Sequence, residues 1–248
     1  MEAGGRSQRR LLQQPTPVVR RYVQLWVHRK VWPSLEASVR AYMRWKLPRV
    51  ERERRRELEK TFASVRYYAE KAESWNLPAA QLLFNIALHL LLAERDIQAV
   101  KIDALTHPDE WSRKLAARMI VLTIVEWDTD KVAGKELRQA LDDVQAPEGI
   151  KKEVFDALRS LRRTRERAES KFLDLRNKTI AHRDPDAMLV YRTIRDLKIK
   201  DVTDVAADFY VGVNAFIHAQ SKLMLHSSSL NAILRQLQAT LRAQASTR

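Results

Sequence analysis

Apolar residues recur every three or four positions along most of the chain, and proline-containing breaks separate the runs. The clearest stripes lie at residues 58–72, 82–91, 115–125 and 205–225. This spacing is typical of helices with one buried face, and no stretch has the strict alternation of a strand. We therefore expect an all-α fold, an up-and-down helical bundle with a helical extension at its N-terminus.

The breaks divide the chain into expected parts. Pro33 and Pro48 should end helices, whereas Pro78 suits the first turn of the next one. The chain then falls into four segments: a basic flexible tail at 1–16, a basic helical N-terminal extension at 17–77, the helical bundle at 78–226 and a polar C-terminal helix at 227–248.

One long helix is expected to begin at Ala146-Pro147-Glu148. It carries an apolar seam with members seven positions apart, filled in between by two more apolar residues: Val154, Leu158, Leu161, Ala168, Phe172 and Leu175. His182 is the next member of the seven-residue series. Asp184 is expected to cap the following helix, with Pro185 as its first residue.

Charge and composition narrow the class of protein. The net charge is +14, and residues 1–60 hold 16 Lys and Arg against six Asp and Glu, so +10 of it lies there. Such an excess favours phosphate-rich partners. The absence of Cys suits a reducing cytosol, and the longest apolar run, residues 82–93, is too short to span a bilayer. We expect a cytoplasmic protein with no membrane partner, although an Arg-rich start is also compatible with a mitochondrial transit peptide.

Residues 174–186 hold the most informative chemistry, because Arg176, Asn177 and His182 occur together near a helix end. Metal-independent RNA cleavage needs a base and an acid, which histidine can supply, and a cation for the charge that develops on phosphorus. Arginine has a guanidinium fork that matches phosphate oxygens, and an amide can orient the phosphate. On an ideal α-helix Arg176 and His182 would point about 120° apart and flank a groove.

The phrase Arg-Asn-Lys-x-x-Ala-His at residues 176–182 resembles the R-x(4–6)-H signature of the HEPN superfamily, in the form common in its abortive-infection branch. The resemblance covers residues 80–226 or so. It implies a HEPN-like bundle, a metal-independent endoribonuclease of a defence or toxin type, and a composite site at a homodimer interface. It further implies an RNA substrate (tRNA or mRNA) and a possible antitoxin or other regulatory partner. Silencing through a tyrosine two residues after the histidine is not implied, since Asp184 stands there.

The resemblance assigns catalysis to Arg176, His182 and Asn177, with Lys178 and Arg183 as substrate-binding residues. No Gly-rich phosphate loop, His-Glu-x-x-His or nucleophile elbow occurs, so no metal or cofactor is expected.

Other interpretations stay open. His182 could be a core or interface residue, and Arg176 an ordinary surface cation. The chain could be a non-catalytic HEPN module that binds RNA or protein through the same groove. It could also be a helical scaffold or DNA-associated protein of a mobile element, acting through its basic N-terminal region, where Tyr42 and Trp45 lie among arginines.

Overall fold

A computed structural model describes residues 32–132, 134–181 and 184–227, together with Leu234 and Gln238. Its helices are α2 (Trp32–Ser74), α3 (Pro78–Thr106), α4 (Glu110–Glu126), α5 (Thr129–Val132), α6 (Glu136–Asp143), α7 (Glu148–Leu175), η2 (Arg176–Ala181), α8 (Ala187–Arg195) and α9 (Ile199–Ser227). Within these ranges there is no strand, so the all-α prediction is confirmed. The expected tail at 1–16 and nearly all of the C-terminal segment lie outside the described residues.

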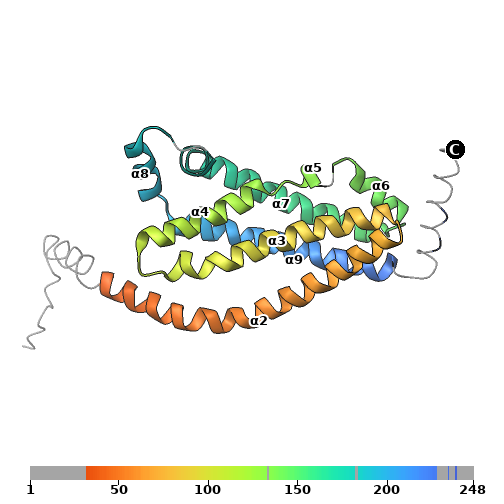
Figure 1. Cartoon of the computed structure of the whole chain (residues 1–248), viewed down its shortest axis with the longest axis horizontal. Coiled ribbons are helices and arrows are strands. Elements are labelled where there is room, and N and C mark those ends of the chain that lie inside the picture. The colour runs from red at the N-terminus through yellow and green to blue at the C-terminus, as the bar shows by residue number, and fades with distance from the viewer. Residues whose placement is uncertain (1–31, 133, 182–183, 228–233, 235–237, 239–248) are drawn as a thin grey trace, which may run out of the picture.

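The long helices alternate in direction and form an elongated bundle (Figure 1). Helix α3 is its centre and contacts α2, α4, α6 and α9. Its side chains are apolar around much of its circumference, and Ile86, Leu90 and Ile97 are fully buried. A helix that is apolar on most sides belongs in the interior, because each methylene withdrawn from water contributes roughly 0.8 kcal/mol.

Helices α7 and α9 pack antiparallel along the other side of the core. All six seam residues of α7 named above are buried, as the seven-residue spacing predicted. Their close approach depends on Gly212 of α9, where an added Cβ would lie 2.7 Å from Leu161 Cγ.

Helix α2 differs from the sequence prediction. It continues through Pro48, which was expected to end a helix. Proline removes one backbone donor and crowds the preceding turn, but no described residue from 35 to 57 is buried, so a local distortion there disturbs no core contact. The expected stripe in its C-terminal half is confirmed, because Leu58, Val65 and Ala72 belong to the same core as α3.

Polar contacts near the middle of α2 hold it to the bundle. Arg54 pairs with the buried Glu94 of α3 at 3.2 Å, and Glu51 pairs with Lys101 at 2.6 Å. Both cations lie over the ring of Tyr210 in α9. Burial raises the pKa of the Tyr210 phenol well above its usual range. Among the described residues, no helix is both long and apolar enough to cross a bilayer.

Candidate functional site

The end of α7 differs from the regular helix that the sequence predicts. Phe172 has non-helical torsions (φ −116°, ψ 18°), and the turns from Arg176 to Ala181 form a π-helix. Hydrogen bonds between residues i and i+5 widen these turns, so the angle of about 120° between Arg176 and His182, calculated for an α-helix, does not apply. Short π-helical segments occur frequently at functional sites.

Arg176 reaches from this segment to the last residue of α4. Its Nε and Nη2 atoms donate to Oε1 of Glu126 at 3.1 and 2.8 Å. The guanidinium has five N–H donors, so this contact uses two of them and leaves others for a ligand. The side chain is 29% exposed, which places a held cation at the surface.

The neighbours of Arg176 share its surface. Asn177 is exposed, and Lys178 pairs with Asp174 at 3.2 Å. Thr179 points the other way: it is buried, and its hydroxyl donates to the carbonyl of Leu175 at 2.6 Å. The π-helical segment is therefore anchored on one side while it presents a cation, an amide and an ammonium on the other.

His182 and Arg183 lie outside the described residues, so the predicted pairing of Arg176 with His182 stays a prediction. Asp184 is the next described residue, and its backbone N–H donates to the carbonyl of Lys178 at 3.1 Å. Asp184 is not the cap of α8, contrary to the sequence prediction. Asp186 has that role, with its carboxylate accepting from the N–H groups of Met188 and Leu189, because the helix begins two residues later than expected.

The other cations of α7 are largely occupied by carboxylates of neighbouring helices and loops. These pairs join Arg162 to Asp130, Arg165 to Asp128, Arg167 to Asp208 and Lys171 to Asp201. Arg165 also donates to the carbonyl of Val125 at the end of α4. Most of the positive charge on this helix thus holds the bundle together and is not available to a polyanion.

Glu126 is the residue of the site that sequence reasoning missed. It lies 50 positions before Arg176, and no local spacing connects the two. Only the packing of α4 against α7 and η2 brings them together. A covarying pair in related sequences is the kind of signal that would find such a contact.

The chemistry available at this site is the binding and orientation of an anion. Arg176 and Lys178 supply positive charge, and the Asn177 amide can donate or accept a hydrogen bond. Glu126 fixes the guanidinium but also neutralises it, so an incoming phosphate must share or displace this contact. Two hollows elsewhere do not include Arg176: one of about 840 Å³ between α6 and α7, and one of about 650 Å³ between α2 and α9.

The described residues contain no cluster of three or more His, Cys, Asp or Glu side chains able to hold a metal ion. Comparison of the chain with protein-family models, with curated proteins and with solved structures finds no match.

Proposed function

We propose that the chain is a HEPN-like, metal-independent endoribonuclease of a defence or toxin type that cleaves RNA by attack of the neighbouring 2′-hydroxyl. One observation carries the proposal. The Arg-Asn-Lys phrase of residues 176–178 lies on an irregular π-helical segment at the surface, with the Arg176 guanidinium held by Glu126. A cation fixed in place before the substrate arrives stabilises developing charge without reorganisation.

Each residue has a role suited to its chemistry. Arg176 stabilises the negative charge that develops on the phosphoryl oxygens, and Asn177 orients the phosphate. His182 acts as base or acid, because an imidazole can both accept and donate a proton in the neutral pH range. Lys178 and Arg183 attract the RNA backbone, and Glu126 sets the orientation of Arg176.

An exposed apolar surface supports the homodimer that a composite site requires. Trp111, Leu115 and Met119 lie four positions apart on α4, and each is close to half exposed. Tyr191 of α8 stacks on Trp111 with 6.2 Å between ring centroids. We name the surface of these four residues the α4–α8 face. Contiguous apolar surface of this kind marks protein interaction sites, and it leads along α4 toward Glu126.

The test is incubation of purified protein with total tRNA and a mixed RNA pool in EDTA, beside the His182→Ala variant. His218→Ala is the matched control, since His218 is exposed on α9. We expect cleavage by the wild type and the control, with 2′,3′-cyclic phosphate ends, and none by His182→Ala. Equal cleavage by all three proteins would remove His182 from the mechanism.

A second candidate follows from the Arg176–Glu126 contact. Because this ion pair neutralises the guanidinium, the same surface also suits a non-catalytic HEPN module that binds RNA or a protein. That function predicts RNA affinity that decreases as salt increases, with no product formed in the same tubes. Tight binding without cleavage would therefore favour the module over the enzyme.

A further inference from the structure

The N-terminal half of α2 is a solvated helix with aromatic and apolar side chains on its surface. Its exposed apolar residues are Leu35, Val39, Tyr42, Trp45 and Val50. Single exposed apolar residues need no explanation, but five at helical spacing on an otherwise hydrated helix indicate a surface that contacts something. Tyr42 and Trp45 are 52% and 59% exposed, so both rings are accessible.

Cations are already stacked on these rings. The Arg49 guanidinium carbon lies 3.8 Å from the centre of the Trp45 ring, and its Nη1 donates to the Trp45 carbonyl at 3.1 Å. The Lys46 ammonium lies 5.5 Å from the centre of the Tyr42 ring. The two ring centroids are 6.1 Å apart. Two turns of helix thus present an ordered array of flat rings and positive charges.

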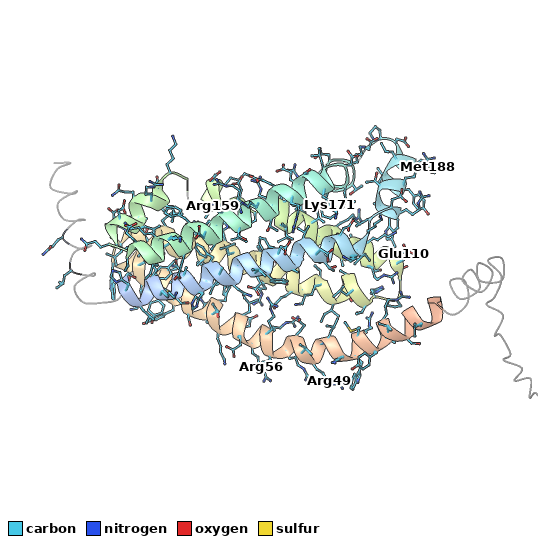
Figure 2. The ribbon with its side chains drawn as sticks, turned by 180° about the vertical axis from the view of Figure 1, so that it is seen from behind. Arg49, Arg56, Glu110, Arg159, Lys171 and Met188 are labelled. Atoms are coloured by element: carbon cyan, nitrogen blue, oxygen red, sulfur yellow. The ribbon has the colours of Figure 1, made fainter. Side chains whose placement is uncertain are left out.

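The same segment has positive charge that the bundle does not neutralise. Residues 40–56 contain eight Lys and Arg and two Glu, and one of those Glu residues, Glu51, is paired with Lys101 of α3. Arg44, Arg52, Arg55 and Arg56 are exposed and pair with no carboxylate among the residues that the structure describes. Figure 2 shows Arg49 and Arg56 on the outer edge of α2, directed away from the bundle. This contrasts with α7, where most of the arginines are held in ion pairs.

The distribution of charge favours RNA over a lipid surface. A helix that lies in a membrane interface keeps its cations on the face opposite its apolar residues. Here Lys46 lies over the ring of Tyr42 and Arg49 over the ring of Trp45, so positive charge covers the aromatic side of the helix. A wet surface of aromatic rings and guanidinium planes instead matches single-stranded RNA, whose bases stack and whose phosphates pair with arginine.

We propose that residues 40–56 of α2 form a binding surface for single-stranded RNA, with Tyr42 and Trp45 stacking bases and Arg44, Arg52, Arg55 and Arg56 contacting phosphates. The segment is about 24 Å long at the α-helical rise, enough to follow several nucleotides. Figure 1 places the N-terminal end of α2 at the same end of the bundle as α8 and the C-terminal end of α7. The identity of the ligand rests on the proposed function, since that function supplies RNA as the substrate.

Binding of a labelled single-stranded RNA 20-mer, measured by anisotropy across a salt series in EDTA, tests this surface. The His182→Ala background keeps the probe intact. We expect Tyr42→Ala with Trp45→Ala to weaken binding about tenfold or more at a constant salt slope. Arg52→Gln, Arg55→Gln and Arg56→Gln together should weaken binding and reduce the salt slope by about two.

Matched controls lie on the same helix. Tyr67 and Trp75 are 53% and 50% exposed, and the Lys71 ammonium lies near both rings, but Glu70 and Glu73 flank them. The double variant Tyr67→Ala with Trp75→Ala should leave RNA affinity unchanged. The triple variant Lys60→Gln, Arg66→Gln and Lys71→Gln should leave it unchanged as well. Equal losses in test and control variants, or no loss in either, would overturn the inference.

Two further outcomes separate this surface from its alternatives. If the variants lose binding to phosphatidylserine vesicles but not to RNA, the surface contacts membranes and the inference is wrong. If wild-type protein binds RNA through α2 but never cleaves it, the proposed function fails while this surface stands. If the wild type cleaves RNA and the α2 variants bind RNA as tightly as the wild type, the proposed function stands and this inference is wrong.

Discussion

The contact between Arg176 and Glu126 should matter little for stability but should affect activity. The two side chains are 29% and 46% exposed, so the pair should contribute less than about 1 kcal/mol to the free energy of unfolding. Under the proposed function, Glu126→Gln removes a competing negative charge and also holds the guanidinium less tightly, because an uncharged acceptor makes a weaker hydrogen bond than a carboxylate. We expect a lower KM for RNA together with a lower kcat, and an almost unchanged urea midpoint.

Asp174→Asn is the control for this prediction. Asp174 pairs with Lys178 on the same surface but does not touch Arg176, so its neutralisation changes the local charge alone. It should lower KM without reducing kcat. If kcat decreases equally in both variants, Glu126 has no special part in positioning Arg176.

Asp109, the N-cap of α4, should make stability depend on pH. Hydrogen bonds from the backbone N–H and the hydroxyl of Ser112, at 2.7 and 2.8 Å, lower the pKa of its carboxyl below the ordinary 3.8. A lowered pKa in the folded state stabilises the protein above the ordinary value, and this contribution disappears as pH decreases through the lowered one. Asp109→Asn keeps an acceptor oxygen but cannot ionise. The melting temperatures of wild type and variant should therefore differ near neutral pH and converge in acid. A difference in melting temperature that stays the same at every pH would contradict this role.

At the scale of elements, the approach of α7 to α9 sets a limit on side-chain size. A Cβ at position 212 would lie 2.7 Å from Cγ and Cδ2 of Leu161, which is fully buried and has little room to move. Gly212→Ala should therefore reduce the free energy of unfolding by about 1–3 kcal/mol, despite the better helix propensity of alanine. Gly149→Ala, where nothing lies within 4 Å, should leave stability unchanged or raise it by up to about 1 kcal/mol. Chemical denaturation of both variants measures the difference, and equal effects would show that the approach is not restrictive.

Which elements the sequence predicts depends on the range of the interaction that forms them. The α7 seam and the stripe at Leu58, Val65 and Ala72 are properties of local spacing, and both are buried as predicted. The uninterrupted course of α2 through Pro48 was missed, because proline's local cost is small where the helix is solvated and so does not force an end. The π-helical turn after Leu175 was also missed, because the spacing of apolar and polar residues does not distinguish a π-helical turn from an α-helical one.

At the scale of the molecule, the bundle was predictable because each long helix of the described chain has apolar surface to bury. The short breaks at residues 75–77 and 107–109 also make α2, α3 and α4 antiparallel neighbours. The Arg176–Glu126 contact was not, since it joins residues 50 positions apart through packing alone. The distribution of usable charge was predictable only in part. The sequence places +10 of the net charge in residues 1–60. Only the structure shows that most arginines of α7 are in ion pairs, and that Arg44, Arg52, Arg55 and Arg56 of α2 are exposed.

Mixing two inactive variants tests whether two copies of the chain together form one catalytic site. If Arg176 of one copy acts with His182 of another, a mixture of Arg176→Ala and His182→Ala chains contains dimers in which one of the two sites is intact. Random pairing makes about half of the dimers mixed, so the equimolar mixture should recover about a quarter of the wild-type rate, although each variant alone is inactive. Adding Leu115→Arg to both chains should abolish the recovery by disrupting the α4–α8 face, because Leu115 is half exposed there. Val211→Arg, a matched change on an exposed position of α9, should not. A mixture that stays inactive, while co-purification of differently tagged chains shows mixed dimers, would place Arg176 and His182 in a site within one chain.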